Sequence, residues 1–135
     1  MSEQMIPPPN VGRVAEASAA GDVAELDLLF RGFADPTRLR LLNALVPGPL
    51  RVNDLVELLG LPQPLVSRHL AYLRRVSLVA CDRGPRSAEY RLATPVGPVH
   101  ERLIDCVRAC FGGIASLGAE RAAAAALGVG ATSRS

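Results

Sequence analysis

The sequence predicts a mainly α-helical fold with one small β-hairpin. Two short amphipathic stretches, 52–59 and 63–75, lie on either side of Gly60, as two helices around a tight turn would. Two short strand-like runs, 78–81 and 88–92, follow directly and are joined by a segment rich in turn residues. Hydrophobic residues make up 49% of the 135-residue chain and aromatic residues 4%, so the expected core is aliphatic. Two helices around a tight turn, followed by a hairpin, predict a winged helix-turn-helix.

Two further helices are expected before the helix-turn-helix. The first is predicted over about 23–34 and the second over about 36–46. Asp35 is a good N-cap for the second helix, and Pro36 suits its first position. The Pro-Gly-Pro sequence that follows should stop this helix, because proline cannot continue it.

A long terminal helix is expected over 95–119. Apolar residues recur there at three- and four-residue steps: Val96, Val99, Leu103, Val107, Cys110 and Ile114. No later core element is predicted to cover this stripe, so it most simply packs against the same helix of a second subunit. The expected order is therefore helix, helix, helix, helix, strand, strand, helix, in a homodimer joined through its terminal helices. The folded domain spans 22–119, between a flexible arm over 1–21 and a flexible tail over 120–135.

The helix predicted over 63–75 has an apolar side and a polar side. Val66, Leu70 and Leu73 fall at i, i+4 and i+7, which places them together. The other side carries Gln, Ser and Arg, which can hydrogen-bond to base edges in the major groove of DNA. Any solvated helix can show this pattern, but the second helix of a helix-turn-helix enters the major groove. The angle of His69 lies between the two sides, so packing and phosphate contact are both open to it. The candidate DNA-binding residues of this helix are Gln63, Pro64, Ser67, Arg68, His69 and Arg74.

The hairpin after this helix is expected to act as the wing. Arg83 and Arg86 lie near its tip, from where cations can reach phosphates or a minor groove. Residues 68–91 include six arginines against two acidic residues, a local charge of +4, whereas the whole chain carries +2. Phosphate contacts supply most of the affinity for nucleic acid, so this excess favours a nucleic-acid-binding face over an ordinary solvated one.

Taken together, these segments resemble the ArsR (ArsR/SmtB-type) family of winged helix-turn-helix repressors over about residues 23–119. The resemblance rests on Ala34-Asp35-Pro36-Thr37-Arg38-Leu39 together with Ser67-Arg68-His69-Leu70 at this separation, and it continues to Tyr90-Arg91-Leu92. It implies a homodimeric repressor that binds a double-stranded DNA operator with an imperfect inverted repeat. It also implies that the operator is released when a metal, metalloid or thiol-reactive signal arrives.

Two positions depart from the family pattern. The helix predicted over 63–75 is the recognition helix, the one that enters the major groove. Pro62 stands where the family usually has Ser or Thr as its cap, so that side-chain cap is missing. Ser77 stands where the family usually has Gly at the end of the same helix, so a left-handed backbone there would be strained.

The sensing residues that the resemblance leads one to look for are only partly present. The Cys-x-Cys of some members is absent, because Leu50-Arg51-Val52-Asn53 stands there. The family's zinc pattern in the last helix is absent too, because His100 lacks a His partner. Cys106 and Cys110 remain, one helical turn apart and on the same side. Such thiolates suit a soft metal or metalloid such as As(III), and a vicinal pair can also be oxidised.

Other interpretations of the cysteines stay open. Cys106 and Cys110 could be small apolar residues in a dimer interface, since unpaired Cys is among the most buried residue types. Cys81, on the wing strand, is better explained as part of the strand core than as a ligand. The effector could also act without thiols, or there could be none.

Other classes of function find little support in the sequence. An enzyme would need a reactive group with a partner, yet the chain has two His, no Gly-rich phosphate loop and no recognisable nucleophile. A winged-helix module that binds protein is an alternative, but it would not need outward base-reading groups such as Gln63, Ser67 and Arg68. No apolar run reaches the ~18–20 residues of a membrane span. Three Cys, an odd number without a secretory pattern, fit the cytoplasm.

Overall fold

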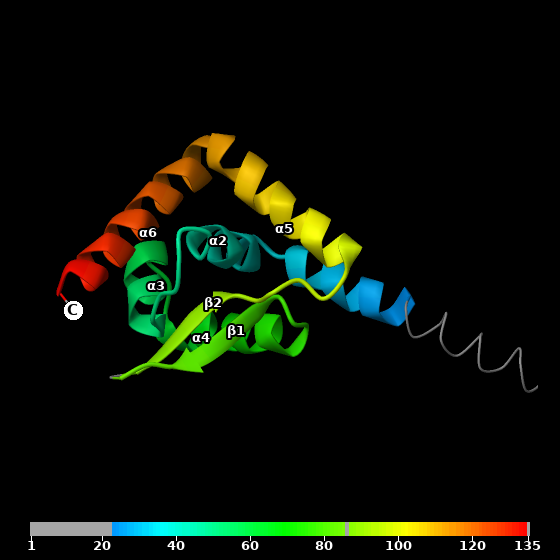
Figure 1. Ribbon diagram of the computed structural model, residues 1–135, viewed down its shortest axis with the longest axis horizontal. Coiled ribbons are helices and arrows are strands. Elements are labelled where there is room, and N and C mark those ends of the chain that lie inside the picture. The colour runs from blue at the N-terminus through cyan, green and yellow to red at the C-terminus, as the bar shows by residue number, and fades with distance from the viewer. Residues whose placement is uncertain (1–22, 86, 135) are drawn as a thin grey trace, which may run out of the picture.

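The computed structural model describes residues 23–85 and 87–134, so the predicted arm over 1–21 and the wing residue Arg86 lie outside the described residues. A helix over 23–33 comes first. The elements after it are α2 (Pro36–Ala44), α3 (Val52–Leu59), α4 (Gln63–Arg75), β1 (Val79–Arg83), β2 (Ala88–Leu92), α5 (Pro98–Cys110), the 3-10 turn η2 (Phe111–Gly113) and α6 (Ala115–Arg134). The winged helix-turn-helix predicted from the sequence is confirmed (Figure 1).

The start of α2 forms as its sequence predicts. The side chain of Asp35 accepts hydrogen bonds from the backbone N–H groups of Thr37, at 2.9 Å, and Arg38, at 3.1 Å. These bonds satisfy two of the amides that a helix N-terminus otherwise leaves without partners. Leu41 and Leu42, one turn later, are fully buried, so this cap positions the helix at the centre of the core.

Helices α3 and α4 form the helix-turn-helix around Gly60. Gly60 has a φ of +65°, a left-handed backbone that glycine adopts without strain, and its N–H donates to the carbonyl of Val56. Both helices turn leucines inward, because Leu55 in α3 and Leu70 and Leu73 in α4 have no exposed surface. The turn and the shared core therefore fix the orientation of α4.

The wing is a two-stranded antiparallel hairpin. Its register runs from Val79 opposite Leu92 to Arg83 opposite Ala88. Leu50 extends it by one bridge to Tyr90, with hydrogen bonds of 3.0 and 2.8 Å in the two directions. The hairpin is thus tied to the segment just before α3.

The two departures at the ends of α4 have visible structural effects. Pro62 is the N-cap, and it makes no side-chain hydrogen bond to the helix. Ser77 has a φ of +66°, in the left-handed region that favours glycine. Its N–H donates to Arg74 O, and the N–H of Leu78 donates to Leu73 O, the pattern of a Schellman motif. The strain predicted at Ser77 is therefore present.

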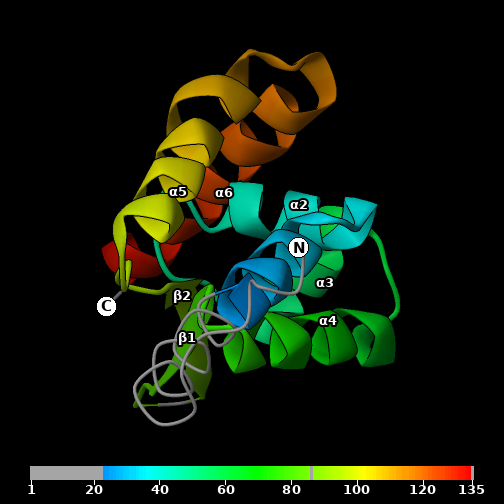
Figure 2. The same cartoon turned by 90° about the vertical axis from the view of Figure 1, so that its right-hand side faces the viewer.

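The C-terminal part of the chain differs from the prediction. The single helix expected over 95–119 is wrong: α5 ends at Cys110, η2 makes a corner, and α6 turns back (Figures 1 and 2). The flexible tail expected over 120–135 is wrong as well, because α6 extends through Arg134 and contacts α2 and α3. Ala124, in the middle of this helix, is buried, with an exposed fraction of 1%.

Glycines explain why the chain can turn at this corner. A Cβ on Gly118 would lie 2.6 Å from the carbonyl oxygen of Gly112, and a Cβ on Gly112 would lie 3.1 Å from Nη1 of Arg121. A larger residue at position 118 would push α6 away from η2, whereas one at position 112 would press on the Arg121 side chain. Gly112 and Gly113 lie within the range 95–119 over which one helix was expected, and they belong to the corner between two helices.

None of the helices in the described part of the chain combines the length and the apolar character needed to cross a membrane.

Candidate DNA-binding surface and thiol pair

The outward side of α4 is polar. Gln63, Pro64 and Arg68 are exposed, and we call these three residues the outer face of α4. Ser67 is half-buried beside them and accepts a long hydrogen bond of 3.5 Å from Nε2 of Gln63. On the opposite side, Val66 is fully buried together with the core leucines of this helix. The predicted division of α4 into a buried and an outward side is confirmed.

The helix-turn-helix and the wing face the same end of the molecule. In both views α4 and the hairpin lie together, and the corner between α5 and α6 lies at the opposite end (Figures 1 and 2). Arg74 and Arg83 are exposed at the ends of α4 and β1. Arg91 is different, because its Nε donates to a carboxylate oxygen of Asp82 at 2.6 Å. One of the six arginines counted in this segment is therefore already paired within the hairpin.

His69 lies on the side of α4 that faces the start of α2. Its side chain is 15% exposed, its Nδ1 accepts from Nη1 of Arg38 at 3.2 Å, and its Nε2 lies 3.7 Å from Oδ2 of Asp35. These contacts tie the recognition helix to the cap of α2. These contacts show that His69 packs within the chain, which is one of the two roles that its sequence position left open.

Arg38 is a residue whose wider role the sequence did not reveal. Its guanidinium donates to the carbonyls of Gly32, at 3.2 Å, and Arg31, at 2.7 Å, at the end of the first helix. It also lies over the ring of Tyr72 in α4. In the sequence Arg38 appeared only as part of the family motif, because its partners come from two other helices.

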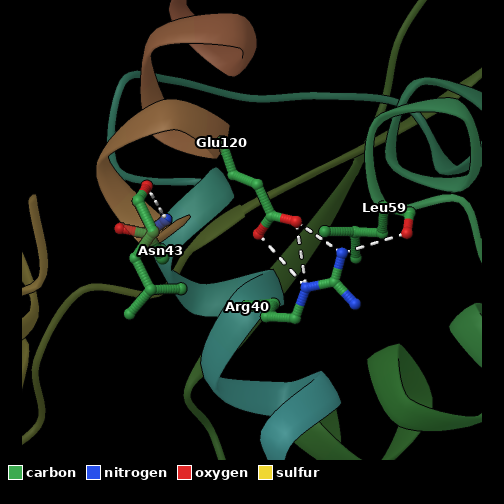
Figure 3. A network of polar contacts seen from close by, with 5 residues as sticks. Arg40, Asn43, Leu59 and Glu120 are labelled. Carbon is green, nitrogen blue, oxygen red and sulfur yellow. Dashed lines mark hydrogen bonds and ion pairs between the residues drawn. The ribbon is translucent and has the colours of Figure 1, made fainter. Parts of the chain in front are cut away.

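Two cross-helix contacts hold α6 against the helix-turn-helix. Nε of Arg40 in α2 donates to both carboxylate oxygens of Glu120, at 3.2 and 3.0 Å, and its Nη2 also bonds to this carboxylate and, at 3.0 Å, to Leu59 O (Figure 3). This hydrogen bond to Glu120 raises the pKa of the Arg40 guanidinium. Asn43, which has no exposed surface, donates from Nδ2 to Leu117 O at 2.9 Å. The adjacent polar pair Glu120-Arg121 in an Ala-rich segment was the one signal in the sequence that could have indicated this docking.

The two cysteines of α5 lie on its exposed side. Cys106 and Cys110 are both exposed free thiols. Partial desolvation and then the neighbouring Cys110 thiol raise the pKa of Cys106, so this thiol keeps its proton more firmly than an isolated one. Among the described residues, no group of three or more His, Cys, Asp and Glu side chains is close enough to hold a metal ion. The described residues thus bring two thiols together on this side of α5.

The third cysteine lies in the middle of β1, the first strand of the wing. Cys81 is half-buried and stands opposite Tyr90 in the hairpin register. Burial, and then the neighbouring Cys81 thiol, raise the pKa of Tyr90, while the Arg74 guanidinium acts in the opposite direction. This cysteine is part of the packing between the strands, as the sequence led us to expect.

His100 is a buried residue at the start of α5. Its exposed fraction is 3%, and its Nδ1 accepts from the backbone N–H of Val96 at 3.3 Å. Its Nε2 has no hydrogen-bond partner among the described residues. Burial lowers the pKa of His100 below its ordinary 6.5, which favours the neutral ring.

Apolar side chains are exposed on the first helix and around the start of α5. A groove of about 760 Å³ separates these two segments, with Leu26 and Leu28 on one side and Val99 on the other. The exposed apolar residues of the two segments are Val23, Leu26, Leu28, Phe30, Val96 and Val99, with exposed fractions from 38% to 81%. The first helix and the start of α5 therefore carry an apolar surface that nothing in the described chain covers.

Comparison with known proteins matches this architecture to one family. The family model described as bacterial regulatory protein, arsR family, matches residues 35–80, which span α2 to the start of β1. The HTH-type transcriptional regulator NmtR of Mycobacterium tuberculosis is 42% identical over 77 residues, which are 57% of this chain and 62% of NmtR. The chain spans about half to three fifths of the length of this and several other curated relatives that it matches.

Two other similar proteins cover more of the chain. The biofilm growth-associated repressor of Agrobacterium fabrum is 30% identical over 104 residues, which are 77% of this chain and 86% of that repressor. The crystal structure of the transcriptional repressor BigR from Xylella fastidiosa superposes with a TM-score of 0.57 at 28% identity, over 73% of this chain and 92% of BigR. The similarity thus extends beyond the helix-turn-helix to most of the folded chain.

Proposed function

The chain belongs to the ArsR family of bacterial regulatory proteins, and we propose that it is a transcriptional repressor that binds an operator in double-stranded DNA. The observation that carries this proposal is the outer face of α4. Gln63, Pro64 and Arg68 are exposed there, while fully buried side chains hold the helix from behind. A helix held in this way can enter the major groove and present its side chains to base edges.

The residues of this surface differ in what they can recognise. Arg68 can donate two hydrogen bonds to a guanine, Gln63 can pair with an adenine, and Ser67 can serve either base. The exposed arginines Arg74 and Arg83, together with Arg86, are suited to phosphates, which fix the register of a protein on the duplex. We assign His69 a packing role, because Arg38 and Asp35 occupy its ring nitrogens.

The repressor acts as a homodimer in this proposal. The exposed apolar residues of the first helix and the start of α5 would be covered by the same residues of a second copy around a two-fold axis. The dimer expected from the sequence is thus retained, but its proposed interface is different. The exposed apolar residues belong to the first helix and the start of α5, and not to one long helix over 95–119. A two-fold dimer binds an imperfect inverted repeat whose half-sites lie about one helical turn apart, ~34–36 Å.

The thiol pair of α5 is the proposed receptor for the signal that releases DNA. Cys106 and Cys110 are exposed and adjacent, and two thiolates suit a soft metal or metalloid such as As(III). A single chain offers no third ligand among its described residues, so the ion would take a ligand from the second subunit or from solution. In the alternative, the two cysteines only pack in the dimer interface and the effector acts elsewhere.

A binding titration tests the proposal as a whole. Fluorescence anisotropy with the DNA upstream of the chain's own gene should show specific binding at a Kd in the ~10⁻⁸–10⁻¹¹ M range. Arsenite should weaken this binding, and the Cys106→Ser/Cys110→Ser double variant should bind DNA as the parent does but ignore arsenite. If no fragment were bound in preference to random DNA, the protein-interaction alternative would replace the repressor. If the double variant still responded to arsenite, the receptor would not be this pair.

A further inference from the structure

We propose that Arg121 of α6 is a positioning residue that transmits the state of the Cys106/Cys110 pair to the helix-turn-helix. The inference rests on the proposed function, since it names the path by which that thiol pair would act on DNA binding. It starts from the three groups that one guanidinium joins.

Arg121 binds the last turn of α5 and the buried part of α2 at the same time. Its Nη1 donates to Arg108 O at 2.9 Å and its Nη2 to Val107 O at 2.5 Å. Its Nε donates to Oδ1 of Asn43 at 3.0 Å. Each nitrogen of the guanidinium thus has a separate backbone or side-chain acceptor, and the planar geometry of the group fixes these acceptors relative to one another.

The two carbonyls that Arg121 binds lie between the two cysteines in the sequence. Residues 107 and 108 belong to the single helical turn that runs from Cys106 to Cys110. The carbonyl of Val107 also accepts from the N–H of Phe111, which closes the helix. A link between the two sulfurs would strain this turn and redirect its carbonyls, because all of them belong to the same short stretch of backbone.

The other end of the contact lies in the core of the helix-turn-helix domain. Asn43 has no exposed surface, and both ends of its amide are bonded to α6, through Leu117 O and through Arg121. If Arg121 moved with the end of α5, the buried amide oxygen of Asn43 would lose its donor, which is costly for a fully buried polar group. Helix α2 contacts α4 directly, so the disturbance reaches the recognition helix through one packed interface.

The corner between α5 and α6 favours such transmission. Gly112 leaves the space in which the Arg121 guanidinium crosses, and Gly118 brings α6 against η2. The neighbouring contact between Arg40 and Glu120 also docks α6 on α2, but it does not touch α5. Glu120 is therefore a matched control for Arg121. Both residues hold α6 on α2, but only Arg121 contacts the turn of α5 that carries the two cysteines.

Phenylarsine oxide is a suitable probe because it needs only two thiols. Its As=O oxygen leaves as water with the two thiol protons, two As–S bonds form, and arsenic stays trivalent. Mass spectrometry of the whole protein should show one adduct per chain, and none in the Cys106→Ser/Cys110→Ser variant. The coupling is the ratio of the Kd for DNA with and without the adduct, and typical coupling of this kind is about 5- to 150-fold.

The decisive comparison is between Arg121→Gln and Glu120→Gln. Both variants should form the adduct. In Arg121→Gln the coupling should fall to within about twofold of unity, whereas Glu120→Gln should keep at least half of the coupling of the parent. A purely structural role in holding α6 would lower the two alike. Retention of the parental coupling in Arg121→Gln would overturn the relay and leave the proposed function intact.

A second measurement on the unmutated protein keeps the inference testable if Arg121→Gln folds poorly. The side-chain amide signals of Asn43 in a ¹⁵N spectrum should shift when the adduct forms. A shift without any loss of DNA affinity would overturn the relay as well as thiol sensing, because the disturbance would then reach Asn43 without reaching the DNA-binding helix. An adduct that leaves these signals in place would overturn the relay, and failure to form the adduct would overturn both proposals.

Discussion

The guanidinium carbon of Arg38 lies 4.3 Å from the centroid of the Tyr72 ring, which joins the start of α2 to the middle of the recognition helix. The same guanidinium binds two carbonyls at the end of the first helix and the ring of His69. Three helices meet at this one side chain. Because the first helix carries part of the exposed apolar surface, Arg38 connects the proposed dimer interface to the proposed DNA-binding helix.

The first prediction concerns this connection. Replacing Arg38 by Gln removes a cation–π contact and several hydrogen bonds to partly buried groups. We expect a loss of about 1–3 kcal/mol in the free energy of unfolding, measured by urea titration. Arg75→Gln is the matched control, because Arg75 is exposed and its guanidinium carbon lies 5.1 Å from the same ring centroid. An equal loss in both variants would mean that the ring contact, and not the capping of the first helix, is what Arg38 contributes.

The second prediction concerns the end of α4. Ser77 has a left-handed φ of +66°. This conformation is strained for a residue with a Cβ but not for glycine. Ser77→Gly should therefore raise the free energy of unfolding by about 0.5–1 kcal/mol, net of the greater flexibility of glycine in the unfolded chain. At Gly60, which has the same backbone conformation, Gly60→Ala should have the opposite sign. Urea midpoints of the two variants decide the matter, and a destabilised Ser77→Gly would show that its hydroxyl contributes more than its backbone costs.

The elements that the sequence predicted correctly have signals close together in the chain. Asp35 caps the helix that begins at the next residue, Gly60 ends one at its own position, and the inward stripe of α4 repeats within seven residues. Such patterns can be read without knowing what lies across the core. The sign of the backbone angle at Ser77 followed from the family pattern in the same way.

The elements that were missed depend on partners far away in the chain. Helix α6 is rich in Ala and has little contrast between its sides, so apart from the polar pair Glu120-Arg121 its sequence resembles that of a fraying tail. Its docking comes from Glu120 and Arg121, whose partners in α2 lie about 80 residues earlier. The helical angle of His69 allowed both packing and DNA contact, and the packing contact with Arg38 depends on a residue 31 positions earlier in the chain.

The third prediction follows from the buried histidine. Burial lowers the pKa of His100 in the folded chain, whereas in the unfolded chain the ring titrates near its ordinary 6.5. Below that pH the His100 ring binds a proton in the unfolded state but stays neutral in the folded state. The free energy of unfolding therefore falls as the pH drops from about 6.5 towards the lower pKa of the folded chain. Above 6.5 the ring is neutral in both states and this effect is absent.

Unfolding free energies measured between pH 5 and 8 should show this decline, and His100→Gln should flatten it. His69→Gln is the control, since His69 is the other histidine of the chain and remains in contact with Arg38 and Asp35 at the surface. A profile that His69→Gln flattens and His100→Gln does not would assign the effect to the contact between α2 and α4 instead.

The last prediction separates base reading from phosphate contact. Arg68 is exposed on the outer face of α4, whereas Arg83 is exposed at the end of β1 in the wing. Arg68→Ala should weaken binding to the preferred operator by about 1–3 kcal/mol and relax the preference at one base pair. Arg83→Ala should weaken all DNA sequences similarly and reduce the slope of log K against log salt by about 1, because a lost phosphate contact releases one counterion fewer.

Arg91→Ala provides the comparison for charge alone. Its guanidinium is already paired with Asp82, so its removal should change the salt slope less than the removal of Arg83 does. Anisotropy titrations at several salt concentrations, on the preferred and on shuffled DNA, separate the three variants. If Arg83→Ala altered sequence preference while Arg68→Ala affected all sequences alike, the wing would be the reading element and α4 the positioning one.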